Sequence, residues 1–125
     1  MGEVRREYAF DLPVPPSVNR YYRHVGYRVL ISREGRRYRM MCVSRLAGSV
    51  EKFTGPVRFS VDVYPPDRRR RDLDNLLKSL QDAIVHAGVM ADDSLIKSLH
   101  MEMRDPVPPE GFVHVHIETL PAERG

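Results

Sequence analysis

The residue types that bind metal ions gather in the middle of the chain. Asp72 and Asp74 are separated by one residue, Lys78 follows four residues after Asp74, and Asp93 comes fifteen residues after Lys78. Carboxylate oxygens, with water and phosphate oxygens, are the ligands that Mg²⁺ prefers. If a helix starts at Asp72, both Asp72 and Asp74 lie at its N-terminal edge and can turn toward one cation. Asp93 can join them only if the chain returns along a neighbouring strand.

Each of these side chains also has a purely structural interpretation. Asp72 can cap a helix, and Asp74 can interact favourably with the helix dipole. Lys78 lies four residues from both Asp74 and Asp82, so surface ion pairs are its ordinary role. Asp93 can be a turn residue. Close carboxylates repel one another unless a cation compensates them, so the metal interpretation needs further support.

That support comes from a run of four arginines directly before Asp72, namely Arg68, Arg69, Arg70 and Arg71. Adjacent cations repel one another, and beside a helix cap they gain little without an anion to bind. The run therefore favours an anionic ligand close to the aspartates.

A second basic segment occurs earlier in the chain and contains Asn19, Arg20, Tyr21, Tyr22 and Arg23. The arginines can hold phosphates, and Tyr21 or Tyr22 can stack on an exposed base. The alternative is an ordinary loop in which one tyrosine packs into the core and the arginines are solvated.

Charge is divided unevenly along the 125 residues, which carry a net charge of +3. Residues 1–71 contain 16 Lys and Arg against 7 Asp and Glu, whereas residues 72–125 contain 4 against 10. A basic surface beside a carboxylate cluster suits a metal-dependent nuclease, although chance can also divide charge in this way. The one cysteine, Cys42, excludes an intramolecular disulfide and a zinc finger. His114 and His116 share one face of a strand and are expected to face solvent or another subunit.

The elements that must position these residues follow from periodicity. Alternating apolar residues predict strands over 7–12, 57–64, 95–103 and 112–120, the last two forming a hairpin. Helical spacing after a Ser32 N-cap continues to Phe53, and a second helix spans 73–87 before Gly88. The predicted fold is a single α+β domain over residues 1–125. It is a two-layer sandwich with a mixed sheet of about four strands and two helices, in the order β-α-β-α-β-β.

The chain contains neither an apolar N-terminal run nor an apolar stretch of eighteen residues. The first eleven residues include Arg5, Arg6 and Glu7 where a signal peptide would be apolar. We therefore expect a cytoplasmic protein without a membrane anchor.

Three segments resemble RusA-type Holliday junction resolvases. They are the stretch from Pro15 to His24, the arginine and aspartate motif from Pro66 to Lys78, and the stretch from Ala87 to Asp93. The segments occur in the family's order and cover most of the chain. The resemblance implies a Mg²⁺-dependent endodeoxyribonuclease that acts as a homodimer on four-way DNA junctions and makes paired symmetric incisions during recombination and repair.

Position by position, the resemblance places the catalytic and metal-binding aspartates at Asp72, Asp74 and Asp93, and the catalytic lysine at Lys78. Metal-activated water would attack the phosphodiester, and Lys78 would stabilise developing negative charge or position that water. The two basic segments would bind DNA. Two alternatives stay open: a non-catalytic module that binds branched DNA, and a nuclease that prefers flaps or other branches.

Overall fold

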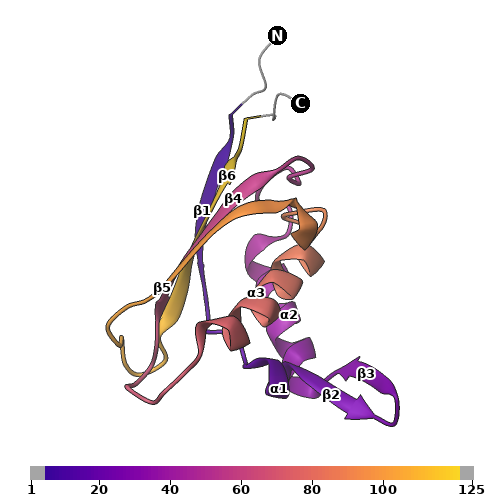
Figure 1. Cartoon of the computed structure of the whole chain (residues 1–125), viewed down its shortest axis with the longest axis vertical. Coiled ribbons are helices and arrows are strands. Elements are labelled where there is room, and N and C mark those ends of the chain that lie inside the picture. Colours follow the sequence, from indigo (N-terminus) through magenta and orange to yellow (C-terminus); the bar gives the residue numbers. More distant parts are fainter. Residues whose placement is uncertain (1–4, 122–125) are drawn as a thin grey trace.

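The computed structural model describes residues 5–121 and contains one four-stranded sheet covered by helices on one face (Figure 1). The sheet strands are β1 (Glu7–Leu12), β4 (Val57–Tyr64), β5 (Ile96–Met103) and β6 (Phe112–Thr119). The helices are α1 (Val18–Tyr21), α2 (Arg33–Leu46), α3 (Leu73–His86) and the short 3₁₀ helix η1 (Asp93–Leu95). A separate hairpin consists of β2 (Tyr22–Val25) and β3 (Arg28–Ile31). The predicted α+β class and mixed four-stranded sheet are confirmed.

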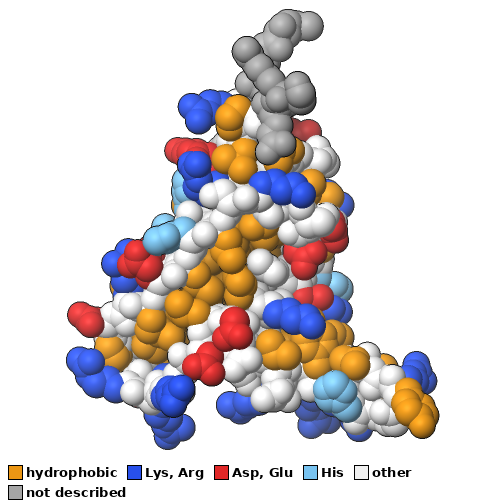
Figure 2. Space-filling view, in the orientation of Figure 1, with side chains coloured by type: hydrophobic (Ala, Val, Ile, Leu, Met, Phe, Trp, Pro, Cys, Tyr) orange, Lys and Arg blue, Asp and Glu red, His pale blue; other side chains and the backbone are white. Residues whose placement is uncertain are grey.

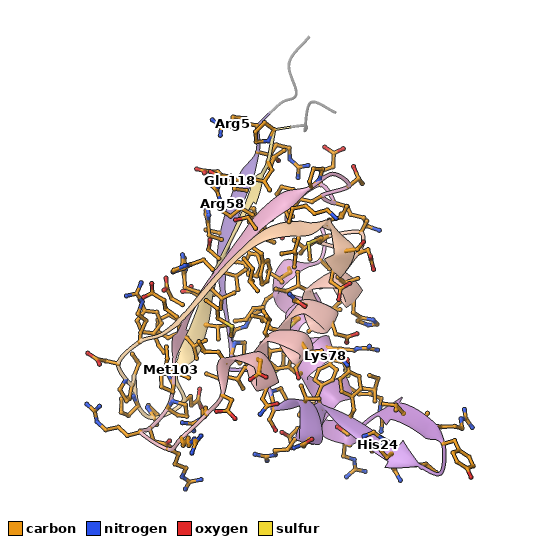
Figure 3. All side chains as sticks on the ribbon, viewed as in Figure 1. Arg5, His24, Arg58, Lys78, Met103 and Glu118 are labelled. Carbon is orange, nitrogen blue, oxygen red and sulfur yellow. The ribbon has the colours of Figure 1, made fainter. Side chains whose placement is uncertain are left out.

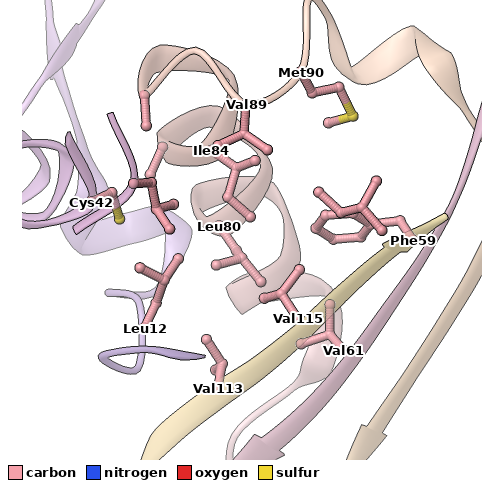
Figure 4. Packing of buried hydrophobic residues seen from close by; sticks show 14 of the residues in the cluster. Leu12, Cys42, Phe59, Val61, Leu80, Ile84, Val89, Met90, Val113 and Val115 are labelled. Atoms are coloured by element: carbon pink, nitrogen blue, oxygen red, sulfur yellow. The ribbon is translucent and has the colours of Figure 1, made fainter. Parts of the chain in front are cut away.

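Strand β4 lies inside the sheet because alternate residues along it are fully apolar. Its inward side chains, Val57, Phe59, Val61 and Val63, are each at most 1% exposed. They pack against the helix layer, where Leu80 of α3 lies over the sheet (Figure 4). The strand pairs in parallel with β5 and antiparallel with β6, which itself pairs antiparallel with β1. The strand order is therefore β1-β6-β4-β5.

The predicted hairpin between the last two strands is wrong, although both strands exist. Strand β4 lies between β5 and β6, so the loop that joins them passes the end of β4 instead of making a tight turn. Helix α3 links β4 to its parallel neighbour β5, which is the connection that parallel strands require. Alternation within a strand shows which face is buried, but it does not identify the strand's partner.

Both long helices begin where the sequence predicts. The Ser32 side chain accepts a hydrogen bond from the Gly35 N–H at 3.0 Å, which confirms the N-cap of α2. This helix ends at Leu46, earlier than its apolar spacing suggests, because Gly48 takes a left-handed conformation with φ of 76°. Phe53 is buried all the same, since it forms a bridge with Met90 in the loop after α3. Gly88 also has the predicted left-handed conformation, with φ of 84°.

The basic aromatic segment is more structured than the sequence predicted. The expected loop contains helix α1 and the hairpin of β2 and β3, which projects away from the body of the protein (Figure 1). No apolar periodicity marks these elements because almost all of the hairpin's side chains are exposed. His114 and His116, in contrast, have the expected half-exposed positions on β6. They lie 2.7 Å from Asp11 and 3.3 Å from Glu7 on the neighbouring β1.

Of the helices within residues 5–121, none combines the length and the apolar character needed to cross a membrane.

Cys42 lies in the core between α2 and the rest of the helix layer (Figure 4). Burial raises the pKa of its thiol to about 12, and a hydrogen bond with Tyr38 offsets only part of this effect. The thiol is therefore neutral at physiological pH.

We expect Cys42 to react with iodoacetamide at pH 8 at least about a hundredfold more slowly in the folded protein than in urea, because the thiolate is the reactive form. Mass spectrometry over a time course measures both rates on the same chain, so the unfolded protein is its own control. Equal rates would contradict burial of this side chain.

Candidate active site

The loop between β4 and α3 is organised by Asp67. Its carboxylate accepts hydrogen bonds from the Arg69 backbone N–H at 3.0 Å and from the Arg71 guanidinium at 2.8 Å. The Arg71 hydrogen bond is the main reason why the pKa of Asp67 is lowered. Arg71 also donates to the carbonyl groups of Asp67 and Arg69. It therefore holds the loop in shape, so the arginine run does not serve an external anion alone.

The other three arginines of the run extend from this loop. Arg68, Arg69 and Arg70 are exposed, and Arg69 makes only a long 3.7 Å contact with Asp67. Within residues 5–121, Arg68 and Arg70 have no carboxylate within 4.0 Å. These side chains are available to an anionic ligand.

Asp72 and Asp74 lie at the start of α3, as predicted. Asp72 occupies the N-cap position with extended backbone angles, but its side chain makes no capping hydrogen bond. Asp74 lies in the first turn, and both residues are exposed. Neither carboxylate has an ion pair with another described residue. The capping interpretation of Asp72 is therefore not supported, and both groups are free to bind a cation.

Asp72 also borders a groove of about 590 Å³ between the start of α3 and helices α1 and α2. Asn75, one turn after the N-cap, shares this wall. Arginines line much of the rest of the groove, namely Arg20, Arg37, Arg69, Arg70 and Arg71. The groove brings both basic segments of the sequence to the same end of α3, where they can contact one polyanion.

Lys78 does not form the ion pairs that its spacing suggested. Its ammonium nitrogen lies 5.5 Å from the centre of the Tyr22 ring, within range of a cation–π contact. Among the described residues it has no carboxylate within 4.0 Å. Asp82, one of its two spacing partners, pairs with Arg39. Figure 3 shows Lys78 on α3, near the base of the hairpin. Its charge is free for a ligand.

Asp82 is held by Arg39 of α2 and by Tyr21 at the end of α1. Arg39 donates to Asp82 Oδ2 at 2.7 and 2.9 Å, and the Tyr21 hydroxyl donates to the same oxygen. Arg39 Nε also lies 3.0 Å from the Tyr21 hydroxyl oxygen. We call these three side chains the Arg39–Asp82–Tyr21 cluster. It joins α1, α2 and α3, and sequence spacing did not predict it because its members come from distant parts of the chain.

Tyr21 cannot stack on a base, although the sequence allowed either Tyr21 or Tyr22 to do so. Its side chain is 0% exposed, and burial, followed by the Asp82 hydrogen bond, raises the pKa of its hydroxyl. Tyr22 is half-buried and packs edge-on against Tyr21, with ring centres 4.8 Å apart. Asn19, Arg20 and Arg23 are exposed around this pair.

The two acidic residues after α3 have different roles. The Asp92 carboxylate accepts a hydrogen bond from the Ser94 N–H at 3.1 Å, and this contact lowers the pKa of Asp92. Asp93 is exposed and lies close enough for its charge to help raise the pKa of Tyr22, after burial and Asp82.

Asp93 does not form a metal-binding group with Asp72 and Asp74 in this structure. Across residues 5–121, no three Asp, Glu, His or Cys side chains lie close enough to hold one metal ion. The structure places Asp72 and Asp74 at the start of α3 and Asp93 at the start of η1.

Comparison with known protein families identifies the chain. Residues 12–119 match the family model described as Endodeoxyribonuclease RusA. The chain belongs to this family. The RusA membership confirms the endodeoxyribonuclease class that the sequence predicted.

Several named relatives share this similarity. The chain is 45% identical over 91 residues to a crossover junction endodeoxyribonuclease of Enterobacteria phage 82. The aligned region covers 71% of this chain and 76% of the relative. The chain is 45% identical over 92 residues to the enzyme of the same name from Escherichia coli K12, with the same coverage. A relative from Escherichia coli O139:H28 is 40% identical over 116 residues. This alignment covers 90% of this chain and 95% of the relative.

We expect Asp82→Ala to lower the free energy of unfolding by about 1–3 kcal/mol, because it leaves Arg39 and the buried Tyr21 hydroxyl without their acceptor. Urea denaturation measures the change. Glu118→Ala is the matched control: it removes the more exposed Arg58–Glu118 pair on the sheet, and its loss should be under about 1 kcal/mol. Similar losses in both variants would show that the cluster does not hold the helices together.

Proposed function

We propose that this chain is a Mg²⁺-dependent endodeoxyribonuclease that resolves four-way DNA junctions by paired symmetric incisions during recombination and repair. The observation that carries the proposal is the start of α3, where the unpaired carboxylates of Asp72 and Asp74 adjoin an arginine-lined groove. A chain of this family needs both features, one to bind metal and the other to bind DNA. The relatives are crossover junction endodeoxyribonucleases by name, and this supports a DNA junction as the substrate.

The side chains at the start of α3 fit a hard divalent cation. Asp72 and Asp74 are exposed oxygen donors, and neither is engaged by another described residue. Mg²⁺ is commonly bound through one or two carboxylates, with water and substrate phosphate completing its shell. When bound, Mg²⁺ supplies a Lewis acid for the scissile phosphate and a more acidic water.

Asp93 is the third proposed ligand. Its neighbour Asp92 is engaged by the Ser94 N–H, whereas Asp93 is exposed. Because like charges repel, three carboxylates gather only when a cation compensates them. We therefore infer that the complete site assembles as metal and DNA bind, since no such group of three forms among residues 5–121.

The cationic side chains have two proposed roles, stabilisation of charge on the reacting phosphate and binding of the flanking phosphates. Lys78, which has no ion pair within the described residues, is placed to stabilise negative charge that develops on the phosphate. Arg20, Arg37 and Arg70 line the groove and hold flanking phosphates. Lys78 thus acts on the reacting group, and the arginines position the DNA.

A four-way junction presents equivalent strands in pairs, so a homodimer can offer one site to each of two opposed strands. We propose this assembly, and we place its action in the cytoplasm with the DNA. A non-catalytic binding module would have no use for unpaired carboxylates beside its basic groove.

The activity itself is tested by incubating the protein with a labelled four-way junction, a flapped duplex and a linear duplex, each with Mg²⁺ or with EDTA. We expect symmetric nicks in the junction only, and only with Mg²⁺. Preferred cutting of the flap would identify a nuclease for other branches. Binding without incision, with any divalent metal, would identify a binding module.

We expect Asp74→Asn and Asp93→Asn each to reduce junction cutting by about a hundredfold or more while junction binding is kept or strengthened, because a metal ligand and a negative charge are removed. Gel-based cutting and binding assays measure the two effects separately. Asp92→Asn is the matched control, since an asparagine can still accept the Ser94 hydrogen bond. Equal loss of cutting in Asp92→Asn and Asp93→Asn would contradict the assignment of Asp93.

A further inference from the structure

The hairpin of β2 and β3 is not explained by the core or by the active site. It forms its own two-stranded sheet, separate from the four-stranded one, and turns at Gly26, which has a φ of 61° (Figure 1). A two-stranded hairpin gains little stability by itself in water. A projecting hairpin of this kind is therefore suited to contacting a partner.

The end of the hairpin exposes apolar side chains. Tyr27 at the turn is 108% exposed, and Val29 is 58% exposed. Val25 and Leu30 are also exposed, so four of the nine large exposed apolar side chains in the described chain lie within these ten residues. Figure 2 shows this apolar group at the projecting end, next to basic side chains. Such a concentration marks an interaction site.

The charges of the hairpin indicate the kind of partner. Arg23, His24 and Arg28 are exposed, and no acidic residue occurs between Tyr22 and Arg33. The strand register pairs Arg23 with Leu30 and Val25 with Arg28, so one face carries two cations and two apolar side chains. A branched DNA offers phosphates and exposed base faces together, which fits this mixture.

The base of the hairpin is fixed to the active site. The Tyr21 carbonyl accepts hydrogen bonds from the N–H and hydroxyl of Ser32, both at 2.9 Å. Gly35 permits this approach of α2, because a Cβ there would lie 2.3 Å from the same carbonyl oxygen. Tyr22, the first hairpin residue, lies beside Lys78. The hairpin thus starts at the reacting end of α3.

The length of the hairpin sets where its tip meets the DNA. Tyr27 lies five residues beyond Tyr22, and a strand rises about 3.3 Å per residue, so the tip extends roughly 16 Å beyond Tyr22. Nucleotides along one strand of a duplex are about 3.4 Å apart. The hairpin is therefore about as long as five nucleotides of one strand, which is short enough for the tip and the active site to contact one junction.

We propose that the hairpin is a branch-point contact, in which Tyr27 stacks on a base exposed at the centre of the junction while Arg23 and Arg28 hold the adjacent phosphates. This inference rests on the proposed function, because it requires branched DNA as the substrate. It adds a recognition element that distinguishes a branch from a continuous duplex, where no base face is exposed.

The test compares wild type with Tyr27→Ala, Tyr27→Phe and Val107→Ala, the last removing an exposed apolar side chain elsewhere. Binding to a synthetic four-way junction and to a linear duplex is measured in EDTA, so that no strand is cut. A 2-aminopurine base at each branch-point position in turn reports changes in stacking. Circular dichroism and sedimentation report folding and oligomeric state.

We expect Tyr27→Ala to weaken junction binding by about fivefold or more, to leave duplex binding unchanged and to remove the 2-aminopurine signal. Tyr27→Phe keeps the ring, and it should behave like wild type, as should Val107→Ala. Unchanged junction binding in Tyr27→Ala would overturn the inference, and so would an equal loss on junction and duplex. A change in oligomeric state with unchanged DNA binding would show that the tip contacts a second copy, which also overturns it.

These outcomes are separable from failure of the proposed function. If wild type cuts junctions with Mg²⁺ and Tyr27→Ala binds them equally well, only the hairpin assignment is wrong. If wild type neither binds nor cuts a junction, both proposals are wrong.

Discussion

The Arg39–Asp82–Tyr21 cluster is the interaction on which the arrangement of the active site depends. A guanidinium from α2, a carboxylate from α3 and a hydroxyl from the end of α1 meet at one oxygen, Asp82 Oδ2. The side chains of the ion pair are only 23% and 30% exposed, so water screens it less than a surface pair. The cluster connects the three helices at the side from which the hairpin emerges. Because Asp82 is already engaged by Arg39, it does not pair with Lys78 one turn earlier on the same helix.

The two carboxylates at the start of α3 make no ion pair with another described residue. Asp67 and Arg71 shape the loop before α3, and this leaves Arg68 and Arg70 extended and Asp72 and Asp74 free. These exposed charges contribute little to the stability of the fold. Exposed ion pairs are weak, and neighbouring carboxylates, like neighbouring arginines, repel one another. Such an arrangement becomes favourable when a divalent cation binds the carboxylates and phosphates bind the arginines.

The hairpin and the groove are the two places at which we propose that this small domain contacts DNA. The groove lies at the start of α3 and borders α1 and α2, whereas the hairpin projects beyond the helix layer (Figures 1 and 3). The segment from Ser17 to Ser32 contributes to both, because Ser17 and Arg20 line the groove and the rest of the segment forms the hairpin. Hydrogen bonds from Ser32 to the Tyr21 carbonyl close this segment at its base. A contact at either place is therefore mechanically connected to α3.

The amino-acid pattern by itself determined the main elements, because burial of one face imposes a period on each of them. It predicted β4, the Ser32 cap, the left-handed Gly88 and the position of the acidic residues at the start of α3. The arginine and aspartate motif also predicted the family, which the match over residues 12–119 confirms.

Only the tertiary structure decided which of these elements and side chains meet. In the folded chain, β4 lies between β5 and β6, and Tyr21 is buried. Asp82 forms an ion pair with Arg39, so it does not pair with Lys78. The tertiary structure also revealed the projecting hairpin. Residues 23–30 are all exposed, so no alternation of buried and exposed side chains marks its strands in the sequence. Local periodicity reports which side of an element is buried, whereas strand partners, ion pairs and grooves depend on contacts between distant segments, and these form only when the whole chain packs.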